Sequence, residues 1–326
     1  MSNQRMADIA ALSRRVEDAA TVGWIARAKA MGAGADYVAE MGGPSRAVDV
    51  LSKALSTGSL AEAGAGTAVT AFIENAARSS AFLAMVAERS FRRAPFDTPL
   101  IHSGSLPLPE GRSEGQMIQV AELELEGAKL KAQSVGTIVI ANDEAWSRID
   151  GPGQSFINGL LQAAVGKAAD ARMFEALAGT TPIAFTAAEG NQAALTAALR
   201  SAMKALLLKS GQSLRWVLSP AAAATLSTIS ADGRISVGPS GGTIFDIPAY
   251  LTEALEPGEM ALIAASEIAA DVIDLSIMRA RSATVQLPGG EQISLFQSNM
   301  TGVRAVLSFG LEPLADAVMA RVTLTE

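Results

Sequence analysis

The 326-residue chain has no cysteine and a single histidine, and it is poor in aromatic and charged residues. Without cysteine there is no disulfide framework and no thiolate metal site. Aromatic residues make up 5% of the chain and charged residues 18%, against a usual charged share of about 25%. The core of such a chain consists mainly of Ala, Leu, Val, Ile and Met.

Long apolar runs and long basic runs are also missing. No apolar run reaches the roughly 18 residues of a membrane span, and the N-terminus is polar and of mixed charge, unlike a secretory signal. We therefore expect a soluble chain that is made and folded in the cytoplasm. The net charge is −7 and no long basic run occurs, so sequence-specific nucleic-acid binding is not indicated.

Hydrophobic residues make up 49% of the chain. Together with the low charge, this indicates that some apolar surface remains exposed on the folded chain. Two explanations stay open: neighbouring subunits cover part of this surface, or the composition reflects an alanine-rich organism.

The first part of the chain has a helical pattern, with helices expected over 7–22, 45–56 and 67–89. Glycine and proline interrupt these helices, and a Gly/Ala/Ser stretch at 58–66 is typical of a linker. We expect residues 1–65 not to pack with the rest.

From Phe91 onward the pattern changes to extended chain and strands. Apolar residues alternate partly with carboxylates over 116–126, which predicts a strand with Glu122, Glu124 and Glu126 on one face. A second strand is expected over 129–140, so that the two form a long two-stranded excursion.

After a turn expected at 150–153, one apolar stripe predicts a long helix that ends at Gly179. The stripe is formed by Ile157, Leu160/Leu161, Ala164/Val165, Ala168 and Ala171. A second helix is expected over 191–209, and Ser219 is expected to cap a third over 221–229. Residues 231–242 are expected to form a polar loop. Further strands are expected at 215–218, 260–265, 272–278, 283–287, 303–311 and 317–324. This order of elements is α+β and not alternating βαβ.

Gly238–Gly242 matches G-x-S-x-G, the nucleophile-elbow pattern around Ser240. That elbow requires a core strand before it, a helix after it and a later histidine base. The only histidine, His102, lies upstream and has no partner for a metal. We interpret Ser240 as part of a flexible loop and His102 as a loop residue, with a serine hydrolase as the alternative.

No phosphate-binding P-loop occurs. The three glutamates of 116–126 are interpreted as a solvated strand face, with a carboxylate metal site as the alternative. Arg89, Arg92 and Arg93 either pair with acids and water or contact nucleic-acid phosphates. Trp146 and Trp216 anchor the core or an interface. We assign no catalytic, cofactor-binding or metal-ligating residue.

Several short motifs follow one another in a fixed order from about residue 72 to 324: 92–96, 117–131, 131–145, 156–179 with Ala169-Asp170, 215–220, 242–248 and 294–305. Together they resemble the HK97-type major capsid family of tailed bacteriophages. Ala141 and Asp246 stand where the family usually has Ser and Gly.

The resemblance implies an HK97-like α+β fold with an N-arm, an E-loop hairpin, a P-domain with a long spine helix, and an A-domain. Its implied divisions are a scaffolding-like N-terminal helical segment (1–65), N-arm (66–100), E-loop (101–132), P-domain (133–182), A-domain (183–288) and C-terminal P-domain strands (289–326).

The resemblance also implies a structural subunit and not an enzyme. Copies of the chain would assemble as hexamers and pentamers into an icosahedral head around double-stranded DNA, which is bound non-specifically. A portal, a scaffolding protein or a maturation protease is expected as a further partner, and no cofactor or membrane. The location would be the virion capsid, assembled in the bacterial host cytoplasm. An encapsulin-like nanocompartment shell of the same fold is the alternative.

Some relatives join an E-loop lysine covalently to an asparagine of a neighbouring subunit. Lys129 or Lys131 and Asn299 lie in comparable regions of this chain, without a local motif for the bond.

Overall fold

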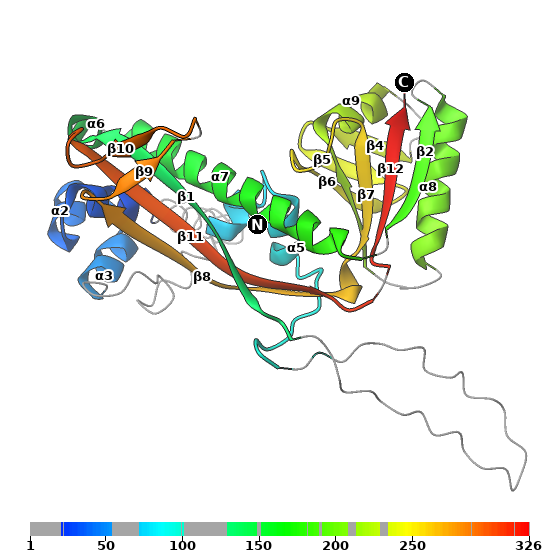
Figure 1. The fold of residues 1–326 in the computed structure, drawn as a ribbon, viewed down its shortest axis with the longest axis horizontal. Coiled ribbons are helices and arrows are strands. Elements are labelled where there is room, and N and C mark those ends of the chain that lie inside the picture. Colours follow the sequence, from blue (N-terminus) through cyan, green and yellow to red (C-terminus); the bar gives the residue numbers. More distant parts are fainter. Residues whose placement is uncertain are drawn as a thin grey trace, which may run out of the picture.

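The computed structural model describes residues 21, 23–53, 72–98, 100, 129–148, 151–180, 182–188, 191–207, 213–228, 234–287, 289–315 and 317–325. Figure 1 shows two bodies, each built on its own sheet. The elongated body contains a three-stranded sheet, and the compact body contains a seven-stranded sheet.

The elongated body consists of a narrow antiparallel sheet and one long helix. Its strands lie in the order β1 (Ala132–Asn142), β11 (Met300–Pro313) and β8 (Ile268–Ala280). The helix α7 (Gly151–Ala178) has 28 residues and runs along the sheet (Figure 1), which makes it about 42 Å long. The prediction of a single long helix in this region is confirmed, but the helix already begins at Gly151, inside the turn expected at 150–153.

Side chains at alternate positions decide which face of this sheet is buried. Val303, Ala305 and Leu307 are buried in the same core as the apolar stripe of α7, whereas Arg304 is exposed on the opposite face. We call that second face the outer face of the elongated sheet.

The compact body has the strand order β2-β12-β7-β3-β6-β5-β4. The helices α8 (Gln192–Leu207) and α9 (Pro220–Thr228) pack against this sheet (Figure 1). In chain order its strands are β2 (Ile183–Ala188), β3 (Leu214–Leu218), β4 (Ile235–Gly238), β5 (Gly241–Ile244), β6 (Ile247–Leu251), β7 (Glu259–Ala264) and β12 (Met319–Thr325).

The two bodies share a hydrophobic core. In β3, Trp216 and Leu218 belong to the core under α8 and α9, while Val217 points the other way into the core of the elongated body. The short helix α5 (Ala81–Ala87) contributes its buried side chains to that shared core. The angle between the two sheets therefore depends on what packs where they meet.

The expectation that residues 1–65 stand apart is wrong for residues 23–53. A helix over 23–31 is followed by α2 (Ala35–Glu40) and α3 (Ser45–Lys53). Ile25 and Ala28 are fully buried in the shared core, because small and branched side chains let this helix approach closely. Apart from Thr21, the helix predicted over 7–22 lies outside the described residues, and so does the linker at 58–66.

The loop expected over 231–242 is instead largely a β-hairpin of β4 and β5. Its two strands have four residues each, and their polar, glycine-rich sequence is more typical of a loop than of a strand. The strands β2, β6 and β10 (Gln292–Ser294) were also not predicted, whereas β9 (Thr284–Gln286) was. The strand expected over 116–126 lies outside the described residues.

The sheets divide the chain differently from the predicted boundary at residue 288. The strand β8 pairs with β11 in the elongated sheet, although it precedes that boundary. The strand β12 pairs with β2 and β7 in the compact sheet, although it follows it. The chain therefore crosses between the two bodies more often than predicted.

A pair of glycine substitutions tests the packing on the outer face. A Cβ at Gly310 would lie 2.5 Å from Phe96 Cε1 and 2.8 Å from Leu130 Cγ, whereas a Cβ at Gly159 in α7 meets nothing within 4 Å. We predict that Gly310→Ala lowers the free energy of unfolding by about 1–3 kcal/mol. Gly159→Ala should leave it unchanged or raise it by up to about 1 kcal/mol. Chemical denaturation measures both, and equal effects would contradict this packing.

Candidate assembly surfaces

The described residues contain no group of three or more His, Cys, Asp or Glu side chains placed to hold a metal ion. The residues His102, Glu122, Glu124 and Glu126 lie outside the described part of the chain. None of the described helices combines the length and apolarity of a membrane crossing.

Ser240 lies in the tight turn between β4 and β5. A strand follows it, not the helix that a nucleophile elbow requires. The glycines of the pattern serve the turn, since Gly241 has a φ of +100° and a Cβ there would collide with the backbone of Ala249. The hydrolase alternative is therefore not favoured.

The three arginines of the predicted basic cluster, Arg89, Arg92 and Arg93, are all exposed. Arg92 joins β8 through its backbone, with its N–H donating to the Ile268 carbonyl. Arg93 lies 3.9 Å from Asp271, so pairing with an acid is what the structure shows for that residue.

Trp146 and Trp216, the two tryptophans expected to be anchors, both belong to the core. Trp146 is 1% exposed and donates from Nε1 to the Thr301 carbonyl at 3.1 Å. Trp216 is fully buried beneath α8 and α9. Of the two roles left open, the structure favours core anchors within one chain.

A buried carboxylate connects three parts of the chain. Asp170 of α7 accepts hydrogen bonds from the hydroxyl of Ser80 at 2.6 Å and the hydroxyl of Thr252 at 2.6 Å. It also accepts from the backbone N–H groups of Ala81 at 3.0 Å and Phe82 at 2.8 Å. Ser80 caps α5, so Asp170 caps the same helix from another element.

This network joins the two bodies at their meeting point. Asp170 belongs to the elongated body, and Thr252 follows β6 of the compact body. Gly166 of α7 makes the contact possible, because a Cβ there would lie 2.9 Å from that of Ser80. Burial raises the pKa of Asp170, and the four donated hydrogen bonds oppose that rise.

Large apolar side chains remain exposed on α7. Phe156 is 67% exposed and Leu160 is 42% exposed. They lie four residues apart, on one side of the helix. No charged residue occurs from Gly151 to Gly166, so the first half of α7 presents an uncharged apolar surface. We call it the α7 patch.

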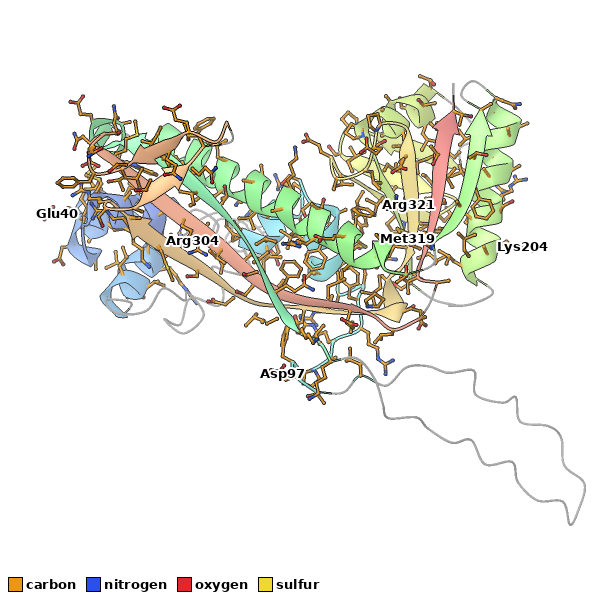
Figure 2. The ribbon with its side chains drawn as sticks, in the orientation of Figure 1. Glu40, Asp97, Lys204, Arg304, Met319 and Arg321 are labelled. Carbon is orange, nitrogen blue, oxygen red and sulfur yellow. The ribbon has the colours of Figure 1, made fainter. Side chains whose placement is uncertain are left out.

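A second exposed patch lies on the outer face of the elongated sheet. Ile138 and Met278 are the cross-strand neighbours of Arg304 on either side, and they are 47% and 48% exposed. Figure 2 shows Arg304 on β11. Arg304 has no hydrogen-bonding or ion-pair partner among the residues that the structure describes. We call this the Arg304 patch.

Solved phage structures resemble this fold. A chain from Microbacterium phage Oxtober96 superposes with a TM-score of 0.50 at 15% identity, covering 76% of this chain and 91% of its own. A chain from Mycobacterium phage Bobi gives 0.50 at 16% identity, covering 73% and 90%.

The chain has the HK97-type capsid fold.

A further structure, described as the capsid of an empty GTA particle computed with C5 symmetry, gives a TM-score of 0.48 at 12% identity, covering 74% and 90%. No protein-family model matches the chain, and no curated protein matches it.

In the terms of the HK97 fold, α7 is the spine helix, the elongated body is the P-domain and the compact body is the A-domain. The predicted E-loop lies almost wholly outside the described residues. Lys131 precedes β1, and Asn299 lies at the other end of the P-domain sheet, next to the Asn142–Met300 pair. The length of β1, about 33 Å, separates them, so a bond between them would have to join two subunits.

Removing the charge of Asp170 tests the joint between the domains. In Asp170→Asn, an amide N–H₂ group replaces one of the two carboxylate oxygens. That group is a donor and cannot accept the hydrogen bonds that the replaced oxygen accepts. We predict a loss of about 3–5 kcal/mol in the free energy of unfolding. Glu175→Gln on the same helix removes an exposed ion pair with Arg172 at 2.6 Å and should cost less than about 1 kcal/mol. Urea denaturation of both variants gives the comparison, and a loss for Asp170→Asn no larger than for Glu175→Gln would contradict the network's role.

Proposed function

We propose that this protein is the major capsid protein of a tailed bacteriophage, a structural subunit that assembles with its own copies into a closed icosahedral shell. The fold carries the proposal: the chain spans about nine-tenths of the phage chains from Oxtober96 and Bobi with which it superposes. The order of sequence motifs supports the same conclusion independently.

The exposed apolar surfaces support assembly. Contact of the Phe156 side chain with water does not stabilise an isolated subunit. Large exposed apolar patches on proteins mark sites where a partner binds. The α7 patch and the Arg304 patch lie on different sides of the P-domain layer. Two different patches favour head-to-tail contacts, and such contacts close into rings when the rotation between copies allows it.

We place this chain in hexamers and pentamers of a phage head, in the virion capsid, after assembly in the host cytoplasm. Each contact can be weak, because every subunit is held by several neighbours at once. A portal and a scaffolding protein or maturation protease complete the proposed set of partners. With a net charge of −7, the shell retains packaged DNA by enclosing it and not by tight binding.

Replacing apolar side chains of the α7 patch tests the proposal. We predict that Phe156→Gln combined with Leu160→Gln reduces particle formation at least tenfold, since burying such side chains contributes about 1.5–3 kcal/mol each. The melting temperature should not fall, because both side chains are exposed in the single chain. Sedimentation velocity and negative-stain microscopy measure the particles.

Ala171→Gln is the control, because it adds the same polar group at an exposed position in the charged half of the same helix. It should assemble like the wild type. A wild-type chain that stays monomeric or dimeric under all assembly conditions would contradict the proposed function.

A further inference from the structure

The helix α5 lies between the A-domain and the P-domain, in contact with elements of both. Its apolar side chains Phe82, Leu83 and Met85 are fully buried in the shared core. Phe82 packs against Phe309 of β11 with a ring-centroid distance of 4.9 Å and the two rings tilted by 49°. The other side of α5 meets β6 of the A-domain.

The N-terminal end of α5 is fixed. Ser80 and the first two N–H groups of the helix are held by Asp170, which is itself fully buried. A buried carboxylate with four donors cannot release them without exposing unpaired polar groups, so this end acts as a pivot.

The C-terminal end of α5 is held differently. Glu88, at its C-cap, accepts a hydrogen bond from the hydroxyl of Tyr250 on β6. Arg215 Nε of β3 lies 3.6 Å from the same carboxylate. Burial and the nearby Glu88 raise the pKa of Tyr250, so its hydroxyl stays protonated and remains a donor.

The contacts at the two ends differ in strength. The Glu88 side chain is 47% exposed, and an exposed ion pair contributes little and is screened by salt. The contact can therefore shift without unfolding the core, whereas the Asp170 contact cannot.

We infer that α5 is a wedge that pivots on Asp170, and that the contact of Glu88 with Tyr250 and Arg215 sets the angle between the A-domain and P-domain sheets. Small shifts of packed helices, about 1–2 Å, are the usual scale of such adjustments. An effect of this angle on the curvature of a shell rests on the proposed function. The control of the angle within a single chain does not rest on it.

The test measures the angle in single chains. The sequence has no cysteine, so Glu40→Cys and Lys204→Cys introduce the only two sites for fluorescent dyes. Both positions are exposed, and Figure 2 places them on opposite domains. Single-molecule energy transfer between the dyes, in the full chain at a concentration too low for assembly, reports the distance between the domains.

Glu88→Gln and Tyr250→Phe should each shift or broaden the distance distribution of the dyes, and high salt should move the wild type in the same direction. The double variant should add little to either single one, because both remove the same contact. Glu175→Gln, which removes an ion pair confined to the spine helix, should match the wild type.

Distributions for Glu88→Gln and Tyr250→Phe that superpose on the wild type would overturn the inference. This readout does not need a shell, so failure of the wild type to assemble would overturn the proposed function alone. If particles form, the same two variants should give a wider range of particle diameters than Glu175→Gln, and equal ranges would refute the link to curvature.

Discussion

The buried carboxylate of Asp170 is the interaction on which the arrangement of this subunit depends. It belongs to the spine helix, caps α5 and holds Thr252 of the A-domain. Taking one charge out of water is costly, and four donors are needed to offset that cost. The penalty for breaking any part of the network is correspondingly large, so the network fixes the point at which the two domains are joined.

The length of the spine helix determines which surfaces of the P-domain remain exposed. A helix of 28 residues can bury only one stripe against a three-stranded sheet. Its other side, together with the outer face of the sheet, remains available to neighbours. The first half of α7 carries no charged residue, so a contact made there avoids the desolvation cost that charged side chains would add. In the proposed shell, these are the surfaces that neighbouring copies would cover.

The sequence predicted the elements whose pattern is long and local. The spine helix follows from periodicity over many residues, and the strand β1 follows from a run rich in β-branched residues. The α+β class follows from the order of the elements, and the HK97-like fold from the order of the motifs. The hairpin of β4 and β5 was missed because strands of four residues with glycine at the turn have little periodicity. The strand β2 was missed because its partner β12 is far away in the sequence.

The joint between the domains was beyond sequence reasoning for the same reason. Asp170 stood out only as part of a family motif, and nothing local connects it to Ser80, 90 residues away, or to Thr252, 82 residues away. The packing of residues 23–53 was missed because a helical pattern shows which face of a helix is apolar but not which distant element covers it. Exposed apolar residues such as Phe156 resembled ordinary core residues until the face that they occupy was known.

A high-resolution electron cryomicroscopy reconstruction of particles formed by the wild-type chain tests the account most directly. The account predicts a closed shell in which every subunit retains all four hydrogen bonds of Asp170, with Phe156 and the Arg304 patch covered by neighbouring copies. A shell in which those apolar side chains face solvent, or in which the Asp170 network is broken in assembled subunits, would contradict it.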